Sequence, residues 1–592
     1  MKNYSFRFFC ILLILAFLSI NSGFATDYYV DSQVGSDSNN GKSPATAWKS
    51  IDKVNAASIT GGDSILFMRG QVFRGTIVPK GGSSVNTLVT YGAYGDNALA
   101  KPKLLASYQR NSSSDWKDEG SNLWSTGDKL TVSPAETLGA DVGNIILGNE
   151  TSCGIKVWNK TDLNVEAEYW YDTTADRVYF YTTHGNPATY YQTIELATKR
   201  KNVDGTARSY LIFENLDFRY GGDGGIGFQG YGTGASYSYP KEITIRDVDV
   251  SYVGGAWLTG TTRAGNGIGF WCGGRNIIVE RCRISQCYDC GLSPQGDLDG
   301  HFNENFYFRN NIFDKNEQSF EMWQGGISST TNLYFENNTC MNAGFGWSRS
   351  QRPNPLGVHI LFYGLASTVT FTNLQIRNNV FINAKDYGIF TTYESNMSKV
   401  NFDYNCWYPQ STTLILQYNY PLNSTVRTPG SYVWSSYRAA YGNEAHSIMA
   451  NPRINTDGSL MSNSPCIDKG LALSTVSNDF KKTARPQGLG YDMGAFEYYV
   501  PNEVTSIKST NFFKAYPNPA SDNITISLEN SFNGNLQISL ISLTGKIIEN
   551  QTIKSSETGK FNYHFYNKPQ TGYYILKVSG EKFSQALPIT IK

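Results

Sequence analysis

Charged side chains are scarce in this chain of 592 residues, where Asp, Glu, Lys and Arg together make up 17%. The 50 basic and 50 acidic residues cancel, so the formal net charge is zero. A nucleic-acid-binding surface needs a broad excess of basic charge, so we expect no nucleic-acid partner. Disordered chains combine high charge with few aromatic residues, whereas 14% of this chain is aromatic. The composition therefore predicts a folded protein.

Long hydrophobic runs are also missing, apart from one near the N-terminus. Lys2 and Arg7 introduce an apolar run at 8–20, and the small residues Gly23 and Ala25 follow it. This pattern is typical of a secretory signal peptide, which we place at residues 1–25. The alternative, a membrane anchor, fits less well because the run is shorter than the about 20 residues that a spanning helix needs. We therefore expect a protein that is secreted or held at the outer cell surface.

Short catalytic motifs are missing as well. No G-x-S-x-G, Walker or Rossmann fingerprint stands in a credible context. Eight cysteines remain after the signal peptide, and the spacing of Cys282, Cys287 and Cys290 does not match a zinc site. We interpret these cysteines as buried packing, and a disulfide stays an alternative in an exported protein. No cofactor is required by any motif in the chain.

Glycine and tyrosine are plentiful, with 57 and 39 residues, which favours short strands joined by tight turns. From about residue 210 an internal repeat appears, in which an alternating apolar strand, a short turn and a second short strand recur. Such a repeat predicts a solenoid, which grows by adding coils and so suits a chain too long for one ordinary core. The repeated segments are 210–228, 242–257, 276–294, 305–323, 332–347 and 373–390.

Asparagines recur at the same position of this repeat. Asn311, Asn338 and Asn379 each stand two residues before the aligned apolar position of their coil. A buried asparagine that recurs once per coil can bond to its equivalent on the next coil and so form a ladder. This feature resembles the asparagine ladders of right-handed parallel β-helices of the pectate-lyase-like superfamily. The aligned apolar positions are Phe218, Val250, Ile284, Phe313, Cys340 and Phe381.

Both ends of the predicted β-helix carry recognisable segments. Trp48, Ile51, Val54 and Ala57 follow helical spacing, which predicts a helix that caps the exposed edge of the first coil. The surrounding segment YYVDSQVGSDSNNGKSPATAWKSIDKVN resembles the start of many secreted bacterial β-helix proteins, and SPCIDKG, RPQG and DMGAFEY resemble their last coil. We therefore assign 26–499 to an all-β, right-handed parallel β-helix catalytic domain. It carries a β-rich, aromatic insertion at about 140–200.

The last 80 residues differ in composition. After a polar linker at 500–512, the motifs YPNPASDNITI, LTGK and TGYYILKV resemble the C-terminal sorting domain of the type IX secretion system. The resemblance predicts a small β-sandwich at 513–592, type IX secretion machinery as a partner, and export across the outer membrane of a Bacteroidetes-type host. A small adhesive β-sandwich is the alternative.

The repeat also predicts which residues face outward, where the function of a β-helix must lie. Alignment of the second short strands places Ile268, Leu292, Phe320, Val358 and Ile389 inside. The following residues then form one outward column of Gly269, Ser293, Glu321, His359 and Phe390. A second outward column consists of Trp271, Gln295, Trp323, Leu361 and Thr392. Because parallel strands lie about 4.8 Å apart, we expect Glu321 and His359 to be neighbours.

Tryptophans and arginines complete the predicted cleft. Exposed indoles stack on sugar rings, and the loop at 347–355 brings Arg349 and Arg352 towards the same strands. A guanidinium suits the binding of a carboxylate or sulfate. The alternatives are a surface Glu–His pair beneath a loop and a solvated basic loop. The predicted substrate-binding residues are Trp271, Gln295, Trp323, Gln324, Trp347 and Arg349.

Two chemistries compete for this predicted cleft, both on a polysaccharide. A β-elimination lyase would use Arg352 to neutralise a uronate, His359 as the base and Tyr363 as the acid, with Lys315 or Lys385 as alternative bases. A glycoside hydrolase would instead pair Glu321 with a second carboxylate, Asp289 or Glu317. The basic loop beside a single Glu–His pair favours the lyase. A non-catalytic carbohydrate-binding or adhesive protein is the third hypothesis.

One loop carries two candidate metal ligands. Asp297 and Asp299 lie in one loop and could supply oxygen ligands to Ca²⁺, but two carboxylates can equally shape a turn. The central segments GNGIGFWCGG and SFEMWQGG also look like a recurring group of bacterial β-helix proteins, which implies carbohydrate cleavage. We expect the protein to act as a monomer.

Overall fold

The structure is a computed structural model with two compact units, residues 1–499 and 500–592. It describes residues 25–126, 140–231, 237–364, 368–409, 413–418, 430–499, 513–528, 534–543, 545–555, 559–566, 569–580 and 583–592. The predicted signal peptide, except for Ala25, and the predicted linker at 500–512 lie outside the described residues.

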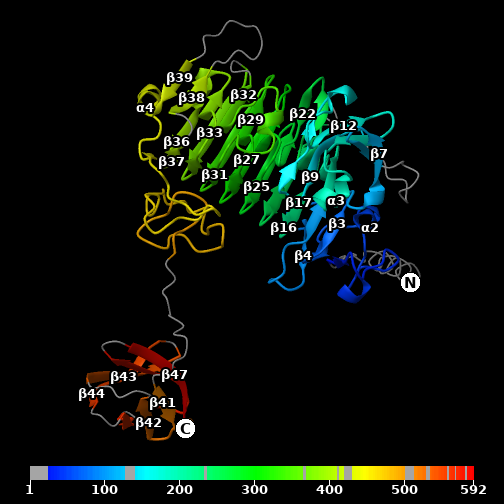
Figure 1. Ribbon diagram of the computed structural model, residues 1–592. Helices are drawn as coiled ribbons and strands as arrows, with labels where there is room; N and C mark the ends of the chain where they lie inside the picture. Colours follow the sequence, from blue (N-terminus) through cyan, green and yellow to red (C-terminus); the bar gives the residue numbers. More distant parts are fainter. Residues whose placement is uncertain are drawn as a thin grey trace, which may run out of the picture. The chain divides into compact units, whose positions relative to one another are not determined.

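The larger unit is a parallel β-helix with three long sheets, and each complete coil gives one strand to each sheet (Figure 1). Sheet 1 contains, in spatial order, β1 (Asp27–Val30), β2 (Ser64–Met68), β4 (Val89–Tyr94), β16 (Leu211–Glu214), β19 (Lys241–Arg246), β24 (Gly274–Glu280), β27 (Phe302–Arg309), β30 (Ser329–Glu336), β33 (Thr370–Arg377) and β36 (Val400–Asp403). Sheet 2 contains β3 (Val72–Arg74), β5 (Lys103–Leu105), β17 (Asp217–Arg219), β20 (Asp249–Ser251), β25 (Arg283–Ser285), β28 (Ile312–Asp314), β31 (Thr339–Met341), β34 (Val380–Ile382), β37 (Cys406–Tyr408) and β40 (Ile448–Met449).

Sheet 3 carries the strands on which the outward columns were predicted. Its members are β15 (Lys201–Asp204), β18 (Gly224–Gln229), β23 (Ile268–Trp271), β26 (Cys290–Gly296), β29 (Gln318–Gln324), β32 (Val358–Gly364), β35 (Tyr387–Thr391), β38 (Leu414–Tyr418) and β39 (Gly430–Val433). The last pair, β38 and β39, is antiparallel, whereas the others are parallel.

Apolar columns inside the coils set the register. On sheet 1, Ile277 aligns with Phe306 and then with Leu333, and all three side chains are buried. Because strand side chains alternate, a slip of one residue would turn such a column out to solvent, so the columns hold each coil in place.

The predicted asparagine ladder is confirmed. The amide of Asn311 donates to Asn338 at 3.1 Å, Asn338 donates to Asn379 at 3.1 Å, and Asn379 donates to Asn405 at 3.0 Å. The ladder thus extends one rung beyond the prediction. It ends on Glu444, which accepts from Asn405 at 3.1 Å. All the ladder amides are buried, so each rung satisfies polar groups that water cannot reach.

Both ends of the solenoid are covered. The short helix α2 (Ile51–Ala56) buries Ile51 and Val54 against the first coils, which confirms the predicted N-terminal cap, and Ser50 caps its first turn. At the other end α4 (Trp434–Tyr441) buries Tyr437 in the same core. Short 3-10 helices lie at Pro44–Thr46, Ser113–Asp115, Lys160–Asp162, Arg349–Gln351 and Glu394–Lys399.

A separate β-structure interrupts the early coils. Its strands begin at Ser107, earlier than the aromatic segment that marks it in the sequence, and its two sheets have their own core around Trp116, Tyr169 and Phe180. The elements are β6 (Ser107–Gln109), β7 (Trp116–Gly120), β8 (Leu123–Thr126), β9 (Val142–Leu147), β10 (Ser152–Cys153), β11 (Ile155–Lys156), β12 (Glu168–Asp172), β13 (Arg177–Tyr181), α3 (Pro187–Tyr191) and β14 (Ile194–Thr198). A hairpin of β21 (Ala256–Thr259) and β22 (Thr262–Ala264) projects from a later coil.

The smaller unit has two antiparallel sheets that share one apolar core. One sheet contains β41 (Phe513–Tyr516), β42 (Asn523–Leu528) and β45 (Lys560–His564). The other contains β43 (Gly534–Ser542), β44 (Ile547–Ser555), β46 (Gly572–Gly580) and β47 (Phe583–Ile591). This arrangement is the small β-sandwich that the sequence predicts.

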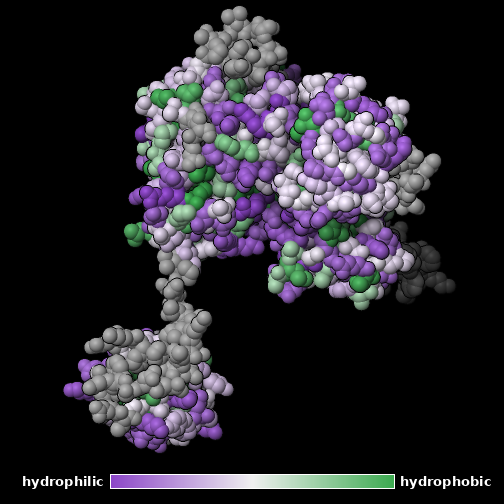
Figure 2. All heavy atoms as spheres, viewed as in Figure 1, coloured by the Kyte–Doolittle hydropathy of each residue, from purple (hydrophilic) through white to green (hydrophobic). Residues whose placement is uncertain are grey.

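Hydrophilic side chains cover most of the viewed face of the larger unit, with hydrophobic ones scattered between them (Figure 2). Within the part of the chain that the structure describes, no helix combines the length and apolar character needed to cross a membrane.

Candidate active site

Glu321 lies in the middle of sheet 3 and points away from the core. Its neighbours in β29, Phe320 and Met322, are buried inside the coil, so the alternation of the strand turns Glu321 outward. Oε2 of Glu321 accepts from Oγ of Ser293 at 2.8 Å and from Nε2 of Gln295 at 3.3 Å. Burial, followed by the negative charge of Asp289, raises the pKa of Glu321 to about 7. A carboxyl group with this pKa holds a proton that it can donate near neutral pH.

Three further acids, Asp289, Glu317 and Asp386, stand at the turn before sheet 3. They occupy the same position on their coils, because the residues that follow them pair in register across β26, β29, β32 and β35. The coil between those of Glu317 and Asp386 has Gly357 at this position. The prediction named Asp289 and Glu317 but missed Asp386. The sequence repeat could have identified Asp386, because Asp386 stands two residues before Gly388 as Asp289 stands two residues before Gly291.

Asp289 pairs with Arg352. Nη1 of Arg352 donates to Oδ1 of Asp289 and to the carbonyl of Tyr288, both at 2.9 Å. The guanidinium also lies 5.0 Å from the ring centroid of Tyr288. This charged contact compensates the negative charge of Asp289, whose side chain is 26% exposed. Asp289 therefore has a cation in contact with it, whereas Glu321 forms no ion pair with any residue that the structure describes.

Glu317 and Arg349 anchor the loop at 345–357. The fully buried Glu317 accepts from Nη1 of Arg349 at 3.2 Å and from the backbone amide of Leu356. Arg349 also binds Asp386 through two bonds of 2.6 and 3.0 Å, and burial raises the pKa of Glu317. Both groups are thus occupied in holding the loop, so neither is placed as a substrate ligand.

The predicted position of His359 is wrong. Phe320 pairs with Ile360 rather than with Val358, and Glu321 pairs with Leu361. His359 therefore aligns with Ser319, and its ring is 1% exposed, with Nδ1 3.1 Å from Oγ of Ser319. Its ring centroid lies 5.6 Å from that of Phe381, and burial lowers the pKa of His359 to about 3. His359 belongs to the core, not to a surface pair with Glu321.

The second outward column forms as predicted except at one position. Tyr363 takes the place predicted for Leu361, beside Trp323. The rings of Trp323 and Tyr363 meet edge to face at 5.1 Å, and the indole is 40% exposed. The negative charge of Glu321, after burial, contributes to a raised pKa of Tyr363, so these side chains lie near one another.

The other residues predicted to bind substrate do not lie together beside Glu321. Trp271 is on the same face, with Nζ of Lys201 4.5 Å from its ring centroid. Gln324 is buried and bonds to Ser328 instead of facing the column. Trp347 packs on Tyr288 and donates to the carbonyl of Gln286 at 2.8 Å, which fixes the loop.

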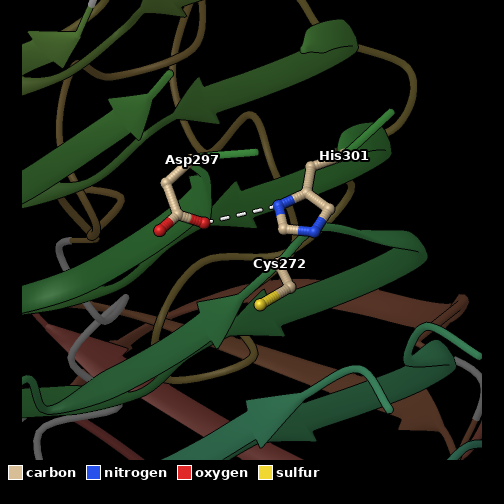
Figure 3. A group of neighbouring side chains, drawn as sticks. All are labelled: Cys272, Asp297 and His301. Carbon is tan, nitrogen blue, oxygen red and sulfur yellow. Dashed lines mark ion pairs between the residues drawn. The ribbon is translucent and has the colours of Figure 1, made fainter. Parts of the chain in front are cut away.

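The predicted calcium pair does not form one group. Oδ1 of Asp299 accepts from the backbone amide of Ile327 at 2.7 Å, as a turn-forming carboxylate does. Asp297 instead lies with Cys272 and His301, and their ligand atoms are within 4.8 Å of one another (Figure 3). Asp297 and Nδ1 of His301 are 3.4 Å apart. Thiolate, imidazole and carboxylate suit Zn²⁺ better than Ca²⁺, but the Leu298 amide already donates to Nδ1 of His301.

Comparisons with known families agree with the fold. Residues 193–401 match the family model of the right-handed β-helix region, so this part of the chain is a right-handed β-helix. Residues 514–592 match the secretion system C-terminal sorting domain. The predicted solenoid and sorting domain are thus confirmed, and the sorting domain indicates secretion and export across the outer membrane.

Individual relatives are distant or partial. A lacto-N-biosidase of Bifidobacterium longum is 33% identical over 129 residues, which is 21% of this chain and 8% of that protein. Among solved structures, a glycoside hydrolase is similar with a TM-score of 0.37 and 11% identity, over 67% of this chain and 90% of the other. A GH136 lacto-N-biosidase from Eubacterium ramulus has a TM-score of 0.31 and 15% identity, over 65% and 64%. A rhamnogalacturonan lyase has a TM-score of 0.32 and 11% identity, over 74% and 88%.

Proposed function

We propose that the larger unit is a carbohydrate-cleaving enzyme, a glycoside hydrolase in which Glu321 is the general acid and Asp289 the second carboxylate. The observation that carries the proposal is the contrast between these two acids. Glu321 has a pKa of about 7, whereas Asp289 binds the guanidinium of Arg352 at 2.9 Å. A carboxyl group whose pKa is raised by burial suits the role of general acid, and a carboxylate held by a guanidinium is placed as its partner.

The hydrogen bonds suggest how Glu321 would work. Ser293 and Gln295 both donate to Oε2, which leaves Oε1 as the oxygen that would carry the proton. Donation of this proton to the glycosidic oxygen would release the leaving sugar. Asp289, held by Arg352, would either attack the anomeric carbon to form a glycosyl ester that water then hydrolyses, or take a proton from the water molecule that attacks this carbon. Trp323 and Tyr363, which flank the acid, would supply aromatic surface for a sugar ring.

The hydrolase replaces the lyase as the better-supported chemistry. The lyase hypothesis depended on an outward His359 as the base and on arginines that could neutralise a uronate. His359 faces the core, and both Arg349 and Arg352 already bind carboxylates of the protein. A lyase would need these contacts to break, whereas the hydrolase uses them as they stand. The sorting domain would bring the enzyme to the type IX secretion machinery.

The proposal can be tested with the purified full chain on a panel of neutral and acidic glycans. The panel includes a rhamnogalacturonan and an oligosaccharide that ends in lacto-N-biose. We expect new reducing ends without the ultraviolet absorbance of an unsaturated uronate. Glu321→Gln should abolish this release, whereas Glu304→Gln, an equivalent change at an exposed ion pair with Arg275, should not. Reducing ends that rise together with the unsaturated product would establish a lyase instead.

A further inference from the structure

An aromatic pocket lies between the early insertion and the β21–β22 hairpin, away from the outward columns of sheet 3. Its volume is about 270 Å³. In Figure 1 the labels of β9, β12 and β22 mark this part of the molecule. The lining of the pocket includes Asp141, Lys156, Trp158, Trp170 and Trp257.

Three indoles line this pocket, and two of them are exposed. Trp158 is 38% and Trp257 42% exposed, although burial of these rings would be favourable. Each has a lysine nearby: Nζ of Lys156 is 5.5 Å from the ring centroid of Trp158, and Nζ of Lys199 is 5.0 Å from that of Trp257. These cation–π contacts hold the exposed rings in place.

The floor of the pocket is polar. Asp141 and Lys156 form an ion pair whose side chains are only 6% and 3% exposed. Asp141 also accepts from the backbone amide of Trp257, and Lys156 donates to the carbonyl of Val142 at 2.9 Å. The ion pair therefore ties the hairpin to the insertion, and Oδ1 of Asp141, which among the described residues accepts only from Lys156, keeps a lone pair that can accept from a hydroxyl beside the aromatic rings.

We propose that this pocket binds a sugar ring of the oligosaccharide, as a subsite remote from the bond that is cleaved. The inference deepens the proposed function and rests on it for the identity of the ligand class. Aromatic faces pack on the C–H surface of a pyranose, and convergent polar groups bond to its hydroxyls. A volume of about 270 Å³ is slightly below the about 300–1,000 Å³ of drug-sized ligand sites, which suits one sugar ring rather than a bundle of chains.

One side chain links the pocket to the carboxylates. Gln351 donates to the carbonyl of Gly154 at 3.0 Å and accepts from the backbone amide of Lys156 at 3.2 Å. It also accepts from Nη1 of Arg263 at 3.1 Å. The next residue, Arg352, holds Asp289. The insertion and the acidic turn are thus joined through Gln351 and Arg352.

Binding can be measured apart from turnover. The Glu321→Gln variant, which should bind the glycan without cleaving it, is the parent protein for affinity electrophoresis. The gels contain pectic galactan, rhamnogalacturonan, arabinoxylan or mucin. We expect at least one glycan to retard this protein, and Trp158→Ala or Trp257→Ala to weaken its affinity about tenfold. Trp158→Phe, which keeps an aromatic ring, should restore part of the affinity. Tyr190→Ala is the matched control, since it removes a 50% exposed aromatic side chain of the same insertion outside the pocket.

The outcomes separate this inference from the proposed function. Unchanged retardation in both tryptophan variants, with folding verified by circular dichroism, would overturn the pocket while hydrolysis stands. No retardation on any of the four glycans would also overturn it. Retardation that is lost in Trp158→Ala, without hydrolysis by the wild-type chain, would support the pocket and overturn the enzyme.

Discussion

The backbone amide of Glu317 donates to the carbonyl of Asp289 at 3.1 Å, so the two acids occupy the same place on consecutive coils. Their side chains nevertheless bind different arginines: Asp289 contacts Arg352, and Glu317 contacts Arg349. The side chain of Asp289 is partly exposed, whereas that of Glu317 is fully buried. Equivalent positions of the repeat have therefore acquired different tasks, one beside the candidate acid Glu321 and one beneath a loop.

The pH dependence of hydrolysis should report Glu321. Since the pKa of this acid is raised to about 7, and the acid must be protonated to act, we expect kcat/KM to fall as the pH rises through about 7. The measurement is a pH profile at substrate concentrations well below KM, with circular dichroism at each pH. A flat profile between about pH 6 and about pH 8 would remove Glu321 from the acid role.

Arg352 should tune this profile. Its positive charge lowers the pKa of Glu321 against the effect of burial. Arg352→Ala should therefore move the alkaline limb to higher pH and should also slow turnover, because Asp289 loses its cation. Arg352→Lys keeps the charge and should leave the limb near its original position. Arg275→Ala, which breaks an exposed pair with Glu304, is the control. A slower enzyme with an unmoved limb would indicate that Arg352 only holds the loop.

His359 should govern acid stability rather than catalysis. Its pKa falls from the ordinary value of 6.5 to about 3 in the folded protein. Between these two pH values the unfolded chain therefore binds a proton that the folded chain does not bind. The stability that neutral His359 contributes is present above pH 6.5 and is lost progressively towards about pH 3. His359→Gln should thus reduce the loss of stability on acidification, measured by thermal unfolding across this range. A folded His359→Gln protein that has lost turnover at neutral pH would revive the lyase.

The asparagine ladder should contribute strongly to the stability of the central coils. Asn338→Ala removes bonds to Asn311, to Asn379 and to the carbonyl of Phe308, and leaves buried groups without partners. We expect a loss of about 3 kcal/mol, seen as a lower unfolding temperature and faster amide hydrogen exchange in β27 and β30. Asn401→Ala, at an exposed position of β36, breaks one side-chain bond to Gln375 and should cost much less. Equal losses in the two variants would contradict the ladder's special role.

The sequence predicts the fold well because a solenoid repeats its signals. Apolar columns, the ladder of Asn311, Asn338 and Asn379, and the capping segment around Ile51 each imply the same coils, and all appear in the structure. The outward face is harder to predict, since its register depends on how the 345–357 loop rejoins the sheet. Gly357 resembles the glycines that open the other strands, yet it sits two residues earlier than they do.

That two-residue shift accounts for the main error at the site. The prediction placed His359 beside Glu321, where the structure has Leu361. It placed Leu361 beside Trp323, where the structure has Tyr363. Glu321 itself was placed correctly because its own coil has no such loop. The partners of Arg349 and Arg352 could not be predicted, since they depend on contacts between residues far apart in the sequence. The aromatic richness around Trp170 was visible, but the pocket it forms with Trp257 requires the folded hairpin.

The coils on either side of the early insertion pair directly with each other. Strand β4 lies against β16 and β5 against β17, although residues 106–210 separate them in the chain. The stacking of these coils therefore does not depend on the insertion strands from β6 to β14, although Gln351 and the Asp141–Lys156 ion pair tie the insertion to later coils. Sequence changes within the insertion are thus compatible with an unchanged stack of coils on both sides of it.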